Sequence, residues 1–176
     1  MKPVVIGVVG AKKSGKTTAI EVLTKELTGR GYRIAAVKHI PERNFTIDRE
    51  GKDTWRYAQA GARTVIGVSA DEVATIEKVH IREFSLKEIL ARCRESDVVF
   101  LEGFRKLAAD SNEIYKILIT KSAEDAEEAA RIFEPVLAFT GPFSTEKLNL
   151  KPPYVELFEH AEKLADLIEE LVKKKR

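Results

Sequence analysis

A glycine-rich segment near the N-terminus has the residue types and spacing best suited to chemistry. The run Gly10-Ala-Lys-Lys-Ser-Gly-Lys-Thr17 fits the pattern G-x-x-x-x-G-K-[ST]. Glycines in such a loop let successive backbone N–H groups approach the oxygens of a phosphate closely. Lys16 would supply an ammonium to the β- and γ-phosphates, and Thr17 a hydroxyl to Mg²⁺. The segment therefore predicts a phosphate-binding loop from Gly10 to Thr17.

A second candidate group is a carboxylate at the end of a short apolar run, residues 98–101. Glu102 follows this run and precedes Gly103. A carboxylate at the ligand-binding edge of a strand can hold a Mg²⁺-bound water or polarise an attacking water. Aspartate is the usual residue here, and the additional methylene of glutamate changes its reach. We expect Glu102 to serve the Mg²⁺ site, with a solvent-facing acid as the alternative.

The polar segment from Lys38 to Thr54 predicts a switch region beside the γ-phosphate. Asp48, within this segment, could reach Mg²⁺ through a water. The expected catalytic residues are thus Lys16, Asp48 and Glu102, and the expected metal ligands are Thr17, Asp48 and Glu102.

Several nearby residues have two interpretations each. Asp53 could cap the helix that follows it or serve the site. Arg56 could contact an anionic ligand or lie exposed on that helix, and His39 could contact phosphate or substrate. Lys13 could touch phosphate or remain a solvated loop residue. Three histidines and one cysteine, Cys93, form no Cys/His cluster in the sequence, so a zinc-type site and an internal disulfide are not expected.

The elements that must position these residues alternate between strands and helices. β-Branched and apolar runs predict strands, and apolar residues at helical spacing predict helices. Such alternation indicates an α/β fold with a mainly parallel sheet flanked by helices and ligands at the carboxyl edge of the strands. The length suits a single domain, residues 1–176. The predicted strands are 3–9, 33–38, 64–69, 73–79, 98–101, 116–120 and 136–140; the predicted helices are 16–30, 52–60, 85–94, 122–131 and 154–173.

Composition excludes several classes of protein. The chain is 44% hydrophobic, which is too high for a disordered chain, and its net charge of +2 gives no overall basic field that would require DNA. No stretch is long and apolar enough to span a bilayer. The apolar run after Lys2 is interpreted as a buried strand rather than a signal peptide. We therefore expect a soluble, cytoplasmic protein with no membrane or DNA partner.

Taken together, the motifs resemble the MobB family of molybdopterin-guanine dinucleotide biosynthesis adaptors. The resemblance covers roughly Pro3 to Ile119. The combination beyond the phosphate loop is far more specific than the loop alone. The matching residues are Gly10-x-x-x-x-Gly15-Lys16-Thr17-Thr18, Val37-Lys38-His39, Asp48, Gly51-Lys52-Asp53-Thr54, Arg56, Gly61-Ala62 and Leu101-Glu102-Gly103-Phe104.

The resemblance implies a P-loop NTPase of the signal-recognition and ParA-like class. It implies that GTP and Mg²⁺ are bound and that the protein works as a homodimer. It also implies a partner, the guanylyltransferase MobA, with molybdopterin as a further candidate ligand. The nucleotide would be held by Gly10, Lys13, Ser14, Gly15, Lys16, Thr17, Thr18 and Lys121.

The choice of base rests on this resemblance. Thr120-Lys121-Ser122-Ala123 follows a strand as an [NT]-K-x-D guanine motif would, but Ala123 stands where the aspartate should be. Lys121 could stack on the base or remain solvated. The leading hypothesis is a GTP-binding adaptor with slow GTPase activity. The alternatives are an ATP-dependent small-molecule kinase or dethiobiotin-synthetase-like ligase, and a nucleotide-binding scaffold without catalysis.

Overall fold

A computed structural model of the chain describes residues 2–79, 85–141, 152–157 and 159–175. The chain forms two compact units. The first contains Met1–His39 and Ser85–Arg176, and the second contains Ile40–Phe84. We describe each unit by itself, and the expected single functional domain remains a prediction.

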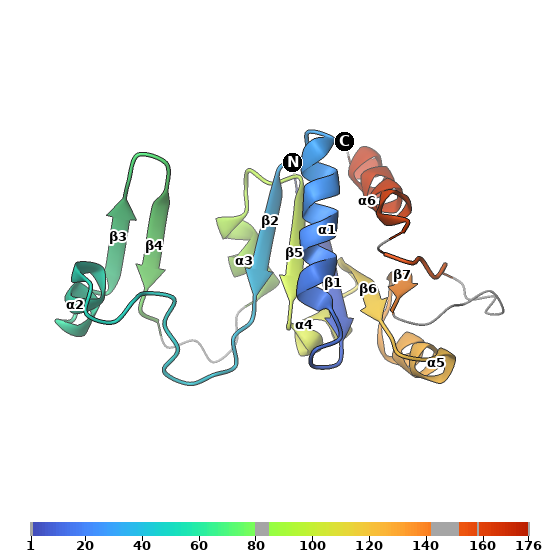
Figure 1. Ribbon diagram of the computed structural model, residues 1–176, viewed down its shortest axis with the longest axis horizontal. Coiled ribbons are helices and arrows are strands. Elements are labelled where there is room, and N and C mark those ends of the chain that lie inside the picture. Colours follow the sequence, from blue (N-terminus) through green and yellow to red (C-terminus); the bar gives the residue numbers. More distant parts are fainter. Residues whose placement is uncertain (1, 80–84, 142–151, 158, 176) are drawn as a thin grey trace. The chain divides into compact units, whose positions relative to one another are not determined.

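The first unit is built on a five-stranded sheet in the order β2-β5-β1-β6-β7 (Figure 1). All neighbouring strands in it are parallel, which confirms the expected mainly parallel sheet. β1 lies between β5 and β6, so the carboxyl ends of these three strands meet at one edge. The strands are β1 (Val4–Gly10), β2 (Ile34–Lys38), β5 (Val98–Glu102), β6 (Ile114–Ile119) and β7 (Val136–Thr140).

Helices cover both faces of this sheet. On β1, Ile6 and Val8 pack in the core cluster that contains α1 (Lys16–Gly29) and α6 (Ala161–Lys175). Val9 packs in the opposite cluster with α4 (Arg105–Ala109) and α5 (Ala123–Ile132). Burial on both faces explains why β1 is an uninterrupted apolar run rather than an alternating one. Each fully buried Val or Ile contributes roughly 1.5–3 kcal/mol relative to an exposed one.

A capping box marks the start of one predicted helix. α3 (Leu86–Arg92) begins after Ser85, and the side chain of Ser85 accepts from the backbone N–H of Glu88 while the Glu88 carboxylate accepts from the N–H of Ser85. These two hydrogen bonds form a capping box, which begins the helix predicted over residues 85–94. The hydrogen bonds from Ser85 also hold the pKa of the Glu88 carboxyl below its usual value.

A fully buried lysine joins the two loops that precede β6 and β7. The Lys116 ammonium, on β6, donates to the carbonyl oxygen of Ser111 at 2.6 Å and to that of Glu134. Burial lowers the pKa of Lys116, because water no longer solvates its charge. The two carbonyl acceptors compensate for part of that lost solvation. Lys116 is therefore a structural residue that fastens the starts of β6 and β7.

The second unit consists of α2 (Asp53–Gln59) and an antiparallel hairpin of β3 (Thr64–Val68) and β4 (Val73–Glu77). The two strands predicted over residues 64–69 and 73–79 are confirmed, and they pair as a hairpin. Val65 is buried, whereas Ile66, Val68 and Val73 are exposed on the alternate positions. One face of the two-stranded sheet is therefore apolar and open.

The structure differs from the predicted elements of the first unit in two places. The last helix begins at Ala161, not at residue 154, because the backbone near Tyr154 pairs with β7 instead. Phe139 donates to the carbonyl of Pro153 at 2.9 Å and accepts from the N–H of Val155 at 2.8 Å. α4 was not predicted, since five residues are too short to show helical periodicity. Among the described residues, no helix is long and apolar enough to cross a membrane.

Candidate functional site

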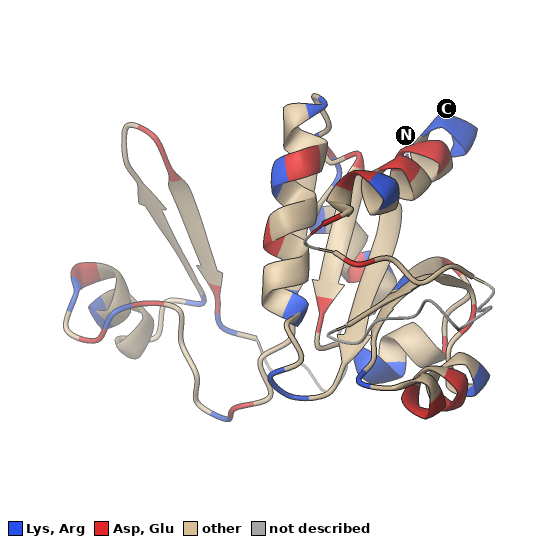
Figure 2. Ribbon diagram, turned by 45° about the vertical axis from the view of Figure 1, so that its right-hand side comes forward, with Lys and Arg blue, Asp and Glu red and all other residues tan. Residues whose placement is uncertain are grey.

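The predicted phosphate-binding loop connects the carboxyl end of β1 to the first turn of α1. Gly15 is the N-cap of α1, with φ 92°, and makes no side-chain capping bond. Lys13 also has a positive φ, 61°, which is rare for a residue with a side chain. Alternating right- and left-handed residues turn successive backbone N–H groups toward one concave side. The loop and the positive end of the α1 dipole therefore form a binding site for an anion. Figure 2 shows Lys or Arg positions in the loop that leads into α1.

Gly10 is required by the close approach of two backbone segments. A Cβ built on Gly10 would lie 2.6 Å from Ser14 Oγ and 2.8 Å from the carbonyl oxygen of Ile119. Ser14 Oγ is itself buried without a hydrogen-bond partner among the described residues. Buried hydroxyls are rarely left unpaired in folded proteins. A phosphate oxygen at this loop would supply the missing partner, so the residues present fit a nucleotide.

Gly10→Ala is expected to lower the free energy of unfolding by about 1–3 kcal/mol, because the added methyl group must displace the backbone at Ile119. Gly29→Ala is the matched control. Gly29 ends α1 and has open space around its Cα, so alanine there should be neutral or stabilise by about 0.5–1 kcal/mol. Urea unfolding of the two variants measures the difference. Equal stability of both variants would contradict the close packing at Gly10.

The side chain of Lys16 folds back over the start of the phosphate-binding loop. Its Nζ donates to the carbonyl oxygen of Ala11 at 2.6 Å and to that of Gly10 at 3.2 Å. These contacts hold the ammonium over the concave side of the loop, where a phosphate would need a positive charge. Thr18 is partly buried in the first turn of α1, and Lys12 and Lys13 are exposed. The contacts of these last three residues with a nucleotide remain predictions.

Thr17 and Glu102 meet although they are 85 positions apart in the sequence. Thr17 Oγ1 lies 3.1 Å from both carboxylate oxygens of Glu102. Lys38 Nζ, at the end of β2, lies 3.1 Å from Glu102 Oε1. The Glu102 side chain is 13% exposed, whereas that of Lys38 is 58% exposed, so solvent still screens the pair from the lysine side. A hydroxyl and a carboxylate are oxygen ligands of the kind Mg²⁺ takes.

The backbone next to Glu102 is also fixed. His39 donates its backbone N–H to the carbonyl oxygen of Glu102 at 2.8 Å. Gly103 has φ 83°, and a Cβ there would lie 3.2 Å from the His39 carbonyl oxygen. The His39 ring packs on that of Phe104, with ring centroids 5.4 Å apart. Lys38 and His39 thus support the Glu102 end of β5, a role that sequence spacing alone does not reveal.

The remaining predicted switch residues belong to the second unit. Asp48 Oδ1 accepts from the N–H of Arg49 at 2.8 Å and from Thr54 Oγ1 at 3.0 Å. Asp48 Oδ2 is buried and lacks a partner in the described part of the chain. Asp53 is not the cap of α2. Lys52 holds that position and makes no side-chain capping bond, and Asp53 instead pairs with Arg56 at 3.6 Å.

Lys121 follows β6 and is exposed. Its backbone N–H donates to Asp125 Oδ2 at 2.9 Å, and the N–H of Asp125 donates to Ser122 Oγ at 3.2 Å. These bonds begin α5 with Ser122 as its N-cap. Asp125 therefore lies just beyond the carboxyl end of β6, where a guanine-binding aspartate would be expected. It stands two positions after Ala123, the position of that aspartate in the guanine motif. Stacking of Lys121 on a base stays a prediction.

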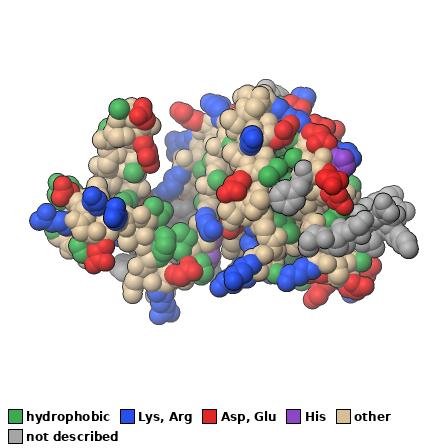
Figure 3. Space-filling view, in the orientation of Figure 1, with side chains coloured by type: hydrophobic (Ala, Val, Ile, Leu, Met, Phe, Trp, Pro, Cys, Tyr) green, Lys and Arg blue, Asp and Glu red, His purple; other side chains and the backbone are tan. Residues whose placement is uncertain are grey.

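Charges of both signs are interspersed over the described residues on the face shown in Figure 3, in keeping with the net charge of +2. Within the described residues, no group of three or more His, Cys, Asp or Glu side chains is placed to hold a metal ion. A Mg²⁺ ion at Thr17 and Glu102 would therefore need phosphate oxygens or water among its ligands, which is usual for this ion.

Comparisons with known proteins agree on one family. Residues 5–137 match the model described as "Molybdopterin guanine dinucleotide synthesis protein B". A molybdopterin-guanine dinucleotide biosynthesis adapter protein of Haemophilus influenzae is 32% identical over 125 residues, which cover 70% of this chain and 69% of that protein.

Solved structures show the same fold. A crystal structure of molybdopterin-guanine biosynthesis protein B has a TM-score of 0.72 at 26% identity, and the match covers 96% of this chain and 99% of that one. The crystal structure of Bacillus subtilis MobB has a TM-score of 0.66 at 24% identity, covering 94% and 96%.

Proposed function

The chain belongs to the molybdopterin guanine dinucleotide synthesis protein B family, MobB, and from this premise we propose that it binds GTP with Mg²⁺ and serves as an adapter in guanylylation of molybdopterin. The relative in Haemophilus influenzae is named an adapter of that biosynthesis. The partner that we propose is the guanylyltransferase MobA, which would receive GTP or the cofactor with the help of this protein. We propose that this step takes place in the cytoplasm.

The observation that carries this proposal is the phosphate loop with its adjoining oxygen ligands. Ser14 Oγ is buried without a partner among the described residues, and Lys16 Nζ lies over the loop. Thr17 and Glu102 offer a hydroxyl and a carboxylate 3.1 Å apart at the same edge. This set suits the triphosphate of a nucleotide with its Mg²⁺.

Each residue would have a separate task. Lys16 would neutralise charge on the β- and γ-phosphates, and Thr17 would ligate Mg²⁺. Glu102 would orient a Mg²⁺-bound or attacking water. Asp48 is retained as a proposal from the sequence alone, with its carboxylate serving Mg²⁺ through a water. When bound, Mg²⁺ would neutralise part of the negative charge of the phosphates.

Hydrolysis by this site should be slow. Unassisted GTPases turn over on the order of 10⁻⁴ to 10⁻² per second. The nucleotide would then act mainly as a conformational ligand that marks the state competent for the partner. Slow turnover suits an adapter, since the bound nucleotide persists until the guanylyltransferase arrives.

We propose a homodimer in which a second copy covers the β3–β4 hairpin. Ile66, Val68 and Val73 are 58%, 74% and 66% exposed on one face of this hairpin. An isolated two-stranded sheet is marginally stable in water and gains from burial of such a face. Val68→Lys with Val73→Lys should shift the sedimentation coefficient from dimer to monomer. Ala74→Lys, at an exposed position on the opposite face of the hairpin, is the control and should leave the dimer intact.

The adapter role is tested in a reconstituted guanylyl transfer reaction. Purified guanylyltransferase, molybdopterin and limiting GTP are mixed with this protein, and formation of the dinucleotide is followed. Wild-type protein is expected to raise the rate, and Lys16→Ala is expected to have no effect. An equal effect of both proteins, or no effect of the wild type, would contradict a nucleotide-dependent adapter.

A further inference from the structure

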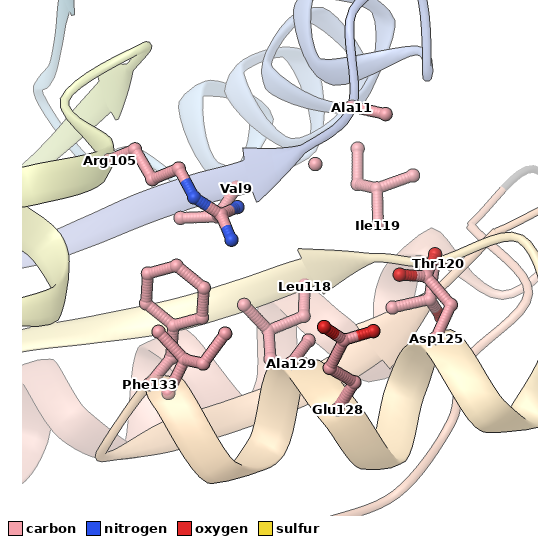
Figure 4. Close-up of a pocket in the computed structure, with 12 residues that line it drawn as sticks. Val9, Ala11, Arg105, Leu118, Ile119, Thr120, Asp125, Glu128, Ala129 and Phe133 are labelled. Carbon is pink, nitrogen blue, oxygen red and sulfur yellow. The ribbon is translucent and has the colours of Figure 1, made fainter.

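A cavity of about 240 Å³ adjoins the phosphate loop on the sheet face opposite α1. Gly10 and Ala11 of the loop form one wall, and the end of β6 forms another. The remaining walls come from α4 and α5, including Arg105, Glu128 and Phe133 (Figure 4). None of the functions described above uses the α4 and α5 side of this cavity.

The cavity lies where topology favours a ligand. The chain passes from β1 through α1 to β2, which lies on one side of β1 in the sheet. It passes from β5 through α4 to β6, which lies on the other side of β1. The chain therefore changes direction at the carboxyl ends of β1 and β6. In open α/β sheets, ligands bind in the crevice at such a switch point.

A buried hydroxyl in the lining gives independent evidence of a ligand. Thr120 is 2% exposed and lines the cavity from the end of β6. Its Oγ1 has no hydrogen-bond partner among the described residues. An unpaired buried hydroxyl costs about 1–3 kcal/mol. A polar ligand atom in the cavity would remove that cost.

Charged groups of opposite sign face the same space. Arg105 lies over the Phe133 ring, with its guanidinium carbon 4.8 Å from the ring centroid. Glu128 and Asp125 approach from α5, three positions apart and so on one face of the helix. Figure 4 shows Arg105 and Glu128 pointing toward the cavity from opposite sides. Only one oxygen of Asp125 is used in the hydrogen bond from Lys121.

These groups match the edge of one kind of heterocycle. A 2-amino-4-oxopyrimidine ring has adjacent N–H donors, which a carboxylate accepts as a pair, and an oxo group, which a guanidinium donates to. Leu118 and Phe133 offer apolar contact to the ring face. A volume of about 240 Å³ is below the roughly 300–1,000 Å³ of pockets for whole drug-sized ligands, so it suits a ring system rather than an entire nucleotide.

We propose that this cavity binds a 2-amino-4-oxopyrimidine ring, with Glu128 and Asp125 accepting from its N–H groups and Arg105 donating to its oxo group. The ring belongs either to a guanine base or to a pterin. The inference rests on the proposed function in the choice between these two ring sources. The cavity would thereby supply the base or cofactor selectivity that the sequence Thr120-Lys121-Ser122-Ala123 lacks.

The test uses ligands without phosphate, so that it does not depend on Lys16. Guanosine and pterin are titrated against the full chain, by calorimetry and by quenching of pterin fluorescence. Adenosine and lumazine are the matched control ligands, because each lacks the 2-amino group and its donor pattern. Guanosine or pterin is expected to bind more tightly than its control.

Variants then assign the binding to the cavity. Asp125→Asn combined with Glu128→Gln should weaken binding roughly tenfold or more, since two hydrogen bonds to charged groups are lost. Asn at position 125 keeps an acceptor for Lys121, so α5 should still form. Glu127→Gln is the control, an exposed acid of the same helix outside the cavity lining. Ala129→Leu, which fills the cavity, should abolish binding.

The outcomes separate the two ring sources. Binding of guanosine alone supports the cavity as a base site, and binding of pterin supports it as a cofactor site. No binding of either, equal binding of the control ligands, or unchanged binding by the double variant overturns the proposal. If GTP binding depends on Lys16 while the double variant changes nothing, only this inference fails and the proposed function stands.

Discussion

Lys16→Ala is expected to bind GTP roughly 10- to 150-fold more weakly than the wild type. Lys16 Nζ lies 2.6 Å and 3.2 Å from carbonyl oxygens of the phosphate loop. The loop thereby holds the ammonium where it would donate hydrogen bonds to phosphate oxygens. Hydrogen bonds to charged groups contribute about 1.5–3 kcal/mol each, and about 1.4 kcal/mol corresponds to tenfold in affinity. Calorimetric titration with GTP in excess Mg²⁺ measures the loss.

Lys25→Ala is the matched control for this variant. Lys25 is exposed on the same helix, α1, and its removal changes the net charge equally. Alanine favours helix at both positions, so neither variant should lose thermal stability. A Lys16→Ala protein that binds GTP as tightly as Lys25→Ala would show that the ammonium does not contact phosphate.

Glu102→Gln is expected to remove the dependence of GTP binding on Mg²⁺ and to lower turnover about 100-fold or more. The carboxylate lies 3.1 Å from Thr17 Oγ1 and pairs with Lys38, so its charge is centred on the proposed metal site. Removing a group that positions or activates water typically costs 10²–10⁴-fold, by order of magnitude. Glutamine keeps the shape and one acceptor, so the strand end should remain folded.

Single-turnover hydrolysis of labelled GTP and titrations with and without Mg²⁺ measure these effects. Glu95→Gln, a change of an exposed acid in the loop before β5, is the control and should behave as the wild type. Retained Mg²⁺ dependence in Glu102→Gln would exclude Glu102 from the metal site. A loss in both variants would point to a general effect of charge.

The sequence predicts best those features that are local. The phosphate loop is recognisable because Gly10, Gly15 and Lys16 each meet a requirement set within eight residues. The α3 capping box is equally local, since Ser85 and Glu88 are one turn apart. β1 could be predicted because burial on both faces demands a continuous apolar run.

Features that depend on distant parts of the chain could not be predicted. Residues near Tyr154 are amphipathic at helical spacing, but pairing with Phe139 of β7 makes them extended. Lys38 gives no sign in the sequence that it pairs with Glu102, 64 positions later. This pairing arises because β5 lies beside β2 in the sheet. Parallel register brings their carboxyl ends together.

The cavity shows the same limit. Arg105 follows β5, whereas Thr120 and Glu128 follow β6, and only the order of strands brings these segments to one edge. The sequence signal that could have indicated the site is the spacing of Asp125 and Glu128, three positions apart at the start of a helix. That spacing is common on solvated helices, so it becomes informative only beside the cavity.

A calorimetric comparison of GTP and ATP, each titrated into the wild-type protein in the presence of Mg²⁺, tests GTP binding at the phosphate loop most directly. We expect GTP to bind more tightly than ATP and its affinity to fall when Mg²⁺ is removed. Equal or tighter binding of ATP would contradict a GTP-binding adapter and would favour an ATP-dependent small-molecule enzyme on the same fold.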